Sequence, residues 1–105
     1  MALKILGQKK LGPGVTDSIY TVPPAKGAVG NLIVCNTDAT NPDDCIIYLV
    51  PSGGSPTAST TIFMQTIPPK ESFVVVAGLS LAEGESVRAY SANGRLTFTF
   101  TGDES

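Results

Sequence analysis

The segment Asn31-Leu-Ile-Val-Cys-Asn-Thr-Asp-Ala-Thr-Asn-Pro-Asp-Asp-Cys-Ile-Ile-Tyr-Leu-Val50 contains two short apolar runs separated by a polar loop. Both runs are rich in β-branched residues, and neither alternates cleanly with polar residues. Runs of this length, bounded by turn residues, are too short for a buried helix and are typical of strands covered on both faces. We therefore expect a β-hairpin at the centre of a sheet. With its cysteines opposite each other, its cross-strand pairs would be Cys35 with Cys45, Val34 with Ile46 and Ile33 with Ile47.

Further strand-length segments lie on both sides of this hairpin. The last of them is the most regular, because every second residue from Leu96 to Phe100 is apolar, as in a half-buried antiparallel strand. Leu79 and Leu81 are expected in a connection that plugs one end of the core, and residues 102–105 are expected to form a short acidic tail. The other expected strands are Leu3–Leu11, Asp17–Val22, Ala28–Asn36, Thr60–Ile67, Ser72–Ala77 and Ser86–Ser91.

Proline and glycine pairs mark the turns. Pro23-Pro24 and Pro68-Pro69 each end a strand and lead through a lysine into an apolar strand, so we expect two equivalent corners with the same turn chemistry. Two similar halves of the sandwich are the alternative explanation for this repeat. Asn93-Gly94 is the strongest hairpin signal, because a type I′ turn needs positive φ at both central positions.

These patterns predict an all-β fold. No part of the sequence has sustained helical periodicity, and seven to eight short strands with regularly spaced turns favour an antiparallel β-sandwich that is jelly-roll-like. Residues 1–14 are expected to be an N-terminal arm or edge strand, with Gly12-Pro13-Gly14 as a hinge. Residues 15–105 are then the β-sandwich domain.

The composition favours a subunit of an assembly. At 105 residues the chain suffices for one domain, yet charged residues are only 15% and the mean hydropathy is +0.18. A subunit that is covered in an assembly tolerates such a neutral surface. The net charge of −2 and pI near 4.8 argue against a nucleic-acid partner, because no excess of basic residues exists to neutralise phosphates.

The N-terminus has no signal-peptide pattern and no segment reaches transmembrane length, so we expect synthesis and assembly in the cytoplasm. A disulfide between Cys35 and Cys45 is disfavoured in that compartment, although a cross-strand position would allow its geometry. We therefore predict that both thiols are reduced. Two thiols without any histidine also make a poor zinc site, because a structural site needs four ligands.

No residue pattern indicates an enzyme. Catalysis would have to proceed without histidine, and Cys35 has no recognisable activating group. Glu83 and Glu85 flank a glycine and are interpreted as turn-forming surface charge. The pair Gly53-Gly54 lacks the lysine and hydroxyl residue of a phosphate-binding loop. We assign no catalytic, cofactor-binding or metal-binding residues and no cofactor. A calcium site is the minor alternative for three aspartates without regular ligand spacing: Asp38, Asp43 and Asp44.

Several segments resemble small virion structural proteins of tailed bacteriophages. They are Tyr20-Thr-Val-Pro-Pro-Ala-Lys26, Leu32-Ile-Val-Cys-Asn36, Tyr48-Leu-Val-Pro-Ser-Gly-Gly-Ser-Pro56, Ile67-Pro-Pro-Lys-Glu-Ser-Phe73 and Leu79-Ser-Leu-Ala-Glu-Gly-Glu-Ser-Val-Arg-Ala-Tyr90. The similarity covers about residues 18–101 and consists of strand and turn patterns. It implies a β-sandwich that decorates or cements a capsid, or that belongs to a tail or fibre. It also implies a homo-oligomer, with a trimer preferred.

Two functional hypotheses follow from this resemblance. The first is a non-enzymatic capsid decoration or cement subunit of a phage virion, assembled in the host bacterial cytoplasm. Its partners would be the major capsid protein or other virion proteins, with no nucleic acid and no membrane. Residues Leu3–Leu11 would then attach it by adding a strand to a neighbour's sheet. The alternative is a tail, baseplate or fibre component, one form of which would be a module that binds host glycans. The lack of tryptophan disfavours glycan binding.

Overall fold

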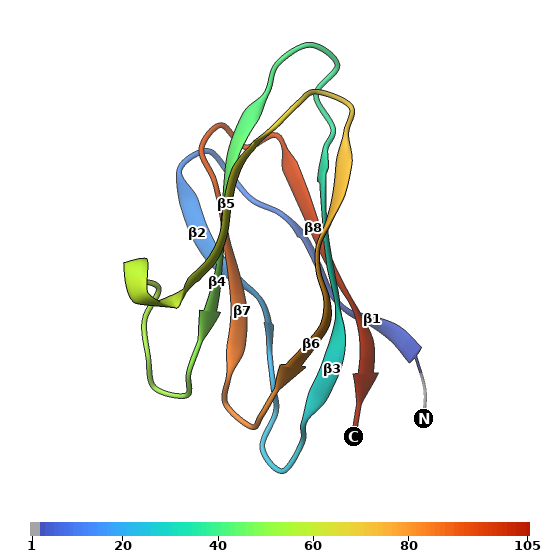
Figure 1. Cartoon of the computed structure of the whole chain (residues 1–105), viewed down its shortest axis with the longest axis vertical. Coiled ribbons are helices and arrows are strands. Elements are labelled where there is room, and N and C mark those ends of the chain that lie inside the picture. The colour runs from blue at the N-terminus through green and yellow to red at the C-terminus, as the bar shows by residue number, and fades with distance from the viewer. Residues whose placement is uncertain (1–2) are drawn as a thin grey trace.

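Eight strands build the protein in the computed structural model, which describes residues 3–105 (Figure 1). A single short 3-10 helix within these residues, η1 (Ala58–Thr60), precedes the fifth strand. The strands are β1 (Leu3–Lys10), β2 (Val15–Thr21), β3 (Ala28–Asn36), β4 (Asp43–Val50), β5 (Thr61–Ile67), β6 (Ser72–Leu81), β7 (Ser86–Ser91) and β8 (Leu96–Glu104).

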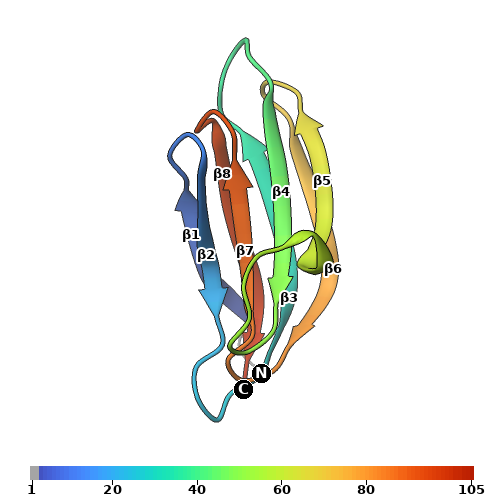
Figure 2. The same cartoon turned by 90° about the vertical axis from the view of Figure 1, so that its left-hand side faces the viewer.

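The strands form two four-stranded antiparallel sheets packed face to face (Figure 2). Sheet A has the order β1-β8-β3-β6, and sheet B has the order β2-β7-β4-β5. Within residues 3–105, every connection crosses from one sheet to the other except the one between β4 and β5. This winding is that of a jelly roll, which confirms the predicted fold class.

The core lies between the sheets and is built from alternate residues of each strand. Sheet A contributes the fully buried side chains Leu96, Phe98 and Phe100, so the alternation predicted for the last strand is confirmed. The ring of Tyr20 in sheet B stacks on Phe100, with ring centroids 5.5 Å apart, and its hydroxyl donates to a carboxylate oxygen of Glu104. The two sheets are therefore joined by apolar packing and by a hydrogen bond.

The central hairpin predicted for residues 31–50 is wrong. β3 and β4 are central strands, but they belong to opposite sheets and do not pair with each other. Buried and less buried residues alternate along β3, but the sequence does not show this alternation, because the outward-facing Ile33 is apolar. The crossing is set by Asn36, whose buried side-chain amide donates to the carbonyl oxygens of Asn41 and Ile67, each at 3.0 Å. Ile67 ends β5 in sheet B, so this amide directs the chain across the sandwich.

The hairpin predicted at Asn93-Gly94 is also wrong, because β7 and β8 lie in different sheets. Gly94 has a φ of +74°, but Asn93 does not have positive φ, so the turn is not type I′. The backbone amide and side-chain amide of Asn93 both donate to Oδ1 of Asp43, at 2.8 and 3.1 Å. These bonds fasten the turn to the first residue of β4 and make it a crossing turn.

Two strands continue beyond their predicted C-terminal ends. β6 continues through Leu79 to Leu81, which the sequence placed in a connection, and Leu81 is buried opposite Ala28. β8 continues to Glu104, so the expected acidic tail is part of the sheet. Both extensions have the same cause. β3 begins at Ala28, and its first residues provide pairing partners for the added residues of β6 and β8.

The two proline corners are equivalent, as the sequence predicted. In each corner the backbone amide of the fourth residue donates to the carbonyl of the first proline: Lys26 to Pro23 at 3.2 Å, and Glu71 to Pro68 at 3.4 Å. The third residue has a φ of +63° in both, Ala25 in one and Lys70 in the other. Proline second and positive φ third define a type II turn. Each turn takes the chain from sheet B to sheet A.

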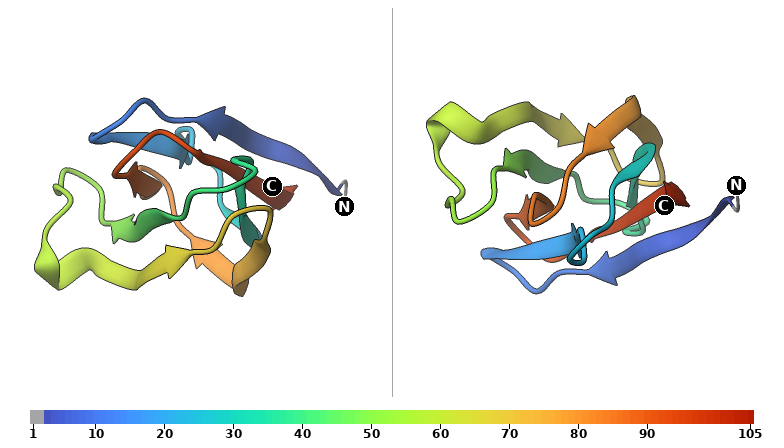
Figure 3. Two further views of the ribbon diagram at one scale, coloured as in Figure 1. Left: turned by 90° about the horizontal axis from the view of Figure 1, so that it is seen from above. Right: turned by 90° about the horizontal axis from the view of Figure 1, so that it is seen from below.

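The two sides of the sandwich differ. On one, which we call the closed side, the edge strands β1 and β2 lie against each other; on the other, the open side, the edge strands β5 and β6 make fewer contacts with each other (Figures 2 and 3). Residues 3–10, expected to be an arm or an edge strand, form the edge strand β1, which pairs with β8. Leu11, directly after it, is buried in the core.

Candidate interaction surfaces

The outer face of sheet A carries exposed apolar side chains among threonines. Leu3 is 77% exposed and Ile5 is 59% exposed, and both project from β1 beside Thr101 and Asp103 of β8. Val29 of β3 belongs to the same face. Exposed large apolar residues that gather on one face mark a site of interaction with another molecule.

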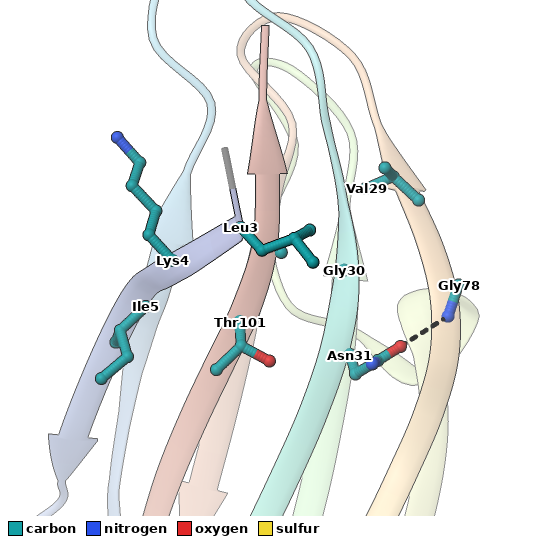
Figure 4. Close-up of a pocket in the computed structure, with 9 residues that line it drawn as sticks. Leu3, Lys4, Ile5, Val29, Gly30, Asn31, Gly78 and Thr101 are labelled. Atoms are coloured by element: carbon teal, nitrogen blue, oxygen red, sulfur yellow. Dashed lines mark hydrogen bonds between the residues drawn. The ribbon is translucent and has the colours of Figure 1, made fainter. Parts of the chain in front are cut away.

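A hollow of about 480 Å³ lies in this face (Figure 4). Gly30 and Gly102 lie opposite each other in β3 and β8, and a Cβ on Gly102 would be 2.0 Å from the carbonyl oxygen of Val29. The lack of side chains at this pair lets the two backbones approach closely, and the hollow lies over them on the outer face. The hollow is lined by Leu3, Lys4, Ile5, Val29, Gly30, Asn31, Gly78, Thr101 and Gly102.

The rim of the hollow is apolar on one side and polar on the other. In Figure 4 the side chain of Leu3 reaches over β8 toward β3, while the ammonium group of Lys4 points away. On the opposite side, Oδ1 of Asn31 accepts a hydrogen bond of 3.0 Å from the backbone amide of Gly78. This bond holds the bulge where β6 passes Asn31, so the hollow has a defined shape.

The outer face of sheet B has a second hollow of about 530 Å³. Its apolar part is a row across three strands, in which Tyr90 of β7 pairs with Ile46 of β4, and Ile46 pairs with Met64 of β5. Met64 is 66% exposed at the edge of the sheet. The hydroxyl of Thr66 donates to Oδ1 of Asp44 at 2.7 Å beside this row, so the neighbouring polar groups are satisfied.

The structure separates the two cysteines. Cys35 lies in sheet A and Cys45 in sheet B, and both are free thiols, so the register that placed them opposite each other is wrong. Cys45 is fully buried, and burial raises the pKa of its thiol to about 12, with a smaller contribution from Asp43. A thiol with such a pKa is not a nucleophile near neutral pH.

Glu83 and Glu85, the acidic pair noted in the sequence, stabilise turns through hydrogen bonds. Oε1 of Glu83 accepts from the backbone amide of Ala25 at 3.0 Å, which ties the first proline corner to the turn after β6. Oε1 of Glu85 accepts from the backbone amide of Ala82 at 2.7 Å. Their interpretation as turn-forming charge agrees with these contacts.

The three aspartates considered as calcium ligands have separate roles. Oδ1 of Asp38 accepts from the backbone amides of Thr40 and Asn41, both at 2.9 Å, and these bonds lower the pKa of Asp38 to about 2. Asp43 is buried and Asp44 bonds to Thr66. Within residues 3–105, no cluster of three or more histidine, cysteine or acidic residues is arranged to hold a metal ion. The same residues contain no helix long and apolar enough to cross a lipid bilayer.

Asp43 is a buried polar centre, a role that the sequence did not predict for it. Its Oδ1 accepts from the backbone amides of Asp44 and Asn93, both at 2.8 Å, and its Oδ2 accepts from Oγ of Ser91 at 2.6 Å and from the amide of Arg95 at 3.0 Å. Burial alone would raise the pKa of Asp43, but these hydrogen bonds hold it below its ordinary value. The Asp43 carboxylate therefore holds β4 and the β7–β8 turn together through hydrogen bonds.

No family model matches this chain, and no curated protein matches it. A solved structure of infectious bursal disease virus, Gt strain, is similar to it at 11% sequence identity and a TM-score of 0.33. The match covers 98% of this chain and 32% of that chain, so this chain spans about a third of its length. A likeness with this TM-score carries no inference about the present chain.

Proposed function

We propose that this chain is a non-enzymatic structural protein of a tailed-phage virion, a decoration or cement subunit that binds capsid proteins. The observation that supports it best is the outer face of sheet A, where exposed Leu3, Ile5 and Val29 surround a hollow. Removing such an apolar face from water costs little free energy. Its burial against a partner stabilises the complex by roughly 25 cal/mol for each Å² of apolar surface.

The fold and the sequence agree with this role. Jelly rolls occur in viral capsid proteins as well as in lectins and cupins. The strand and turn segments that resemble phage virion proteins lie in β2, β3, β4, β6, β7 and the turns beside them, including the proline corners, which together form much of the sandwich. Attachment through the outer face of sheet A uses the exposed residues of β1 while β1 stays paired with β8.

Deletion of the N-terminal strand would be an ambiguous test of this proposal. Deleting residues 2–11 would remove an entire strand of sheet A and the buried Leu11, so loss of binding could reflect unfolding. Substitutions of exposed side chains avoid this problem. We expect the double variant Ile5→Lys, Val29→Lys to fold, because both side chains are exposed, and to bind capsid particles at least about tenfold more weakly, since charges would be buried without partners.

The measurement is the occupancy of purified chain added to particles assembled without it. The matched control is Val15→Lys, Thr16→Lys, which adds the same charge at exposed positions of β2. Equal occupancy of the two double variants would contradict attachment through sheet A. Localisation of the chain to a tail, or retention on a glycan array, would support the alternative of a tail or fibre component instead.

A further inference from the structure

Three of the four sheet edges are protected against pairing with another strand. β1 carries Lys4, Lys9 and Lys10, and lysines on an edge oppose strand addition. β2 is covered by β1: Nζ of Lys9 bonds to Oδ2 of Asp17 at 3.1 Å and to the carbonyl of Ser18 at 3.0 Å. β6 is interrupted by two register shifts and by Gly78 with a φ of +72°. Each of these features is known to protect the edge of a sheet against pairing with another strand.

β5 is the edge without such a device. Its sequence, Thr61-Ile-Phe-Met-Gln-Thr-Ile67, contains no charged residue and no proline. From Phe63 to Ile67 it pairs regularly with β4, and its register shift is confined to the Tyr48 end. The outer backbone edge of a regular, uncharged strand offers free amide and carbonyl groups to another extended chain.

The side chains next to this edge indicate which chain would pair with it. The apolar row Tyr90–Ile46–Met64 crosses sheet B and ends at Met64, which is 66% exposed. An antiparallel β5–β5 pair around a two-fold axis at Met64 would continue the row with Met64, Ile46 and Tyr90 of a second copy. No like charges would meet along the paired strands, because β5 has none.

We propose that two copies of this chain associate through antiparallel pairing of β5, which joins their B sheets into one eight-stranded sheet. Such a contact uses the same surface on both copies, as closed two-fold symmetry requires. The pair differs from the trimer that the sequence resemblance implies. It is independent of the proposed capsid contact, which uses the outer face of sheet A.

The test is the mass of the purified chain in solution, measured by sedimentation from micromolar to near-millimolar concentration. We expect a species of twice 10.9 kDa that dissociates on dilution. Met64→Lys places two lysines against each other at the two-fold axis, so the dissociation constant should rise at least about tenfold. The matched control is Val74→Lys on the neighbouring edge β6, where the side chain is similarly exposed at 63%. This variant should pair like the wild type.

Cross-linking gives a second measurement, because a disulfide traps the paired state covalently. In a Cys35→Ser background, Met64→Cys should form a disulfide between copies on mild oxidation, because directly opposed Cβ atoms approach to about 4.5 Å, which a disulfide can span. Val74→Cys should not. A monomer or a trimer at every concentration, unchanged pairing of Met64→Lys, or dissociation by Val74→Lys would each overturn the proposal.

Discussion

Asp43 shows how one buried carboxylate organises a crossing turn. Its two oxygens accept from groups on β4, β7 and the β7–β8 connection, so it ties together segments about 50 residues apart in the chain. A buried carboxylate is costly unless it is fully hydrogen-bonded, and here the bonds are sufficient to hold its pKa below the ordinary value of 3.8.

We expect Asp43→Asn to lower the free energy of unfolding by about 2–3 kcal/mol near pH 7, measured by urea titration. The amide can replace only one oxygen, so its NH2 group would face a donor such as the amide of Arg95. The control is Asp44→Asn, whose side chain is exposed and bonds to one hydroxyl. A loss as large in the control would contradict the role given to Asp43.

The same carboxylate should make stability depend on acid. Because its pKa is lower folded than unfolded, its contribution is fully present above the ordinary value of 3.8 and is lost as the pH falls through the folded pKa. The lowered pKa values of Asp17 and Asp38 contribute to the same loss of stability at low pH. We therefore expect the wild type to lose stability below about pH 4, and Asp43→Asn to lose less over that range.

The two proline corners are the elements that return the chain from sheet B to sheet A. Each places a residue other than glycine at positive φ, Ala25 in one corner and Lys70 in the other. That conformation costs roughly 1–2 kcal/mol for a residue with a Cβ. Pro24 and Pro69 offset part of this cost, since proline is preorganised for the second position of a type II turn.

We expect Ala25→Gly to stabilise the protein by about 0.5–1 kcal/mol, because relief of the left-handed strain exceeds the added entropy of the unfolded chain. The matched control is Ala39→Gly, at an exposed loop position without positive φ, where the same change should be neutral or destabilising. Thermal unfolding of both variants provides the comparison. Destabilisation by Ala25→Gly would show that its turn is not strained.

The connectivity of the sandwich separates neighbours in the chain. Within residues 3–105, only β4 and β5 are consecutive along the chain and also adjacent in a sheet. β1 pairs with β8, so the first and last described strands must meet before sheet A is complete. Contacts of this kind require closure of long loops before they stabilise the chain.

We expect refolding from urea on a timescale of about milliseconds to seconds, as in other folds dominated by non-local pairing. Stopped-flow tyrosine fluorescence can follow it, since Tyr20 becomes buried against Phe100. Refolding within microseconds would indicate that local structure forms first and controls the rate.

Local chemistry was sufficient to predict the class of fold and much of its detail. The alternation in β8, the approximate positions of the strands and the shared turn of the two proline corners follow from rules that act over a few residues. The same rules identified Glu83 and Glu85 as turn residues. Each of these features depends on the backbone and its near neighbours, so a single sequence contains the information.

Strand partners were decided only by the tertiary structure. A strand with one buried face has the same alternation whether the next strand pairs with it or lies in the opposite sheet, so residues 31–50 and Asn93-Gly94 suggested hairpins that do not exist. The role of Asp43 and the unprotected edge of β5 also depend on which strands are neighbours. Hydrogen bonds and packing between distant segments select one winding among several that share a pattern, and no local rule ranks them.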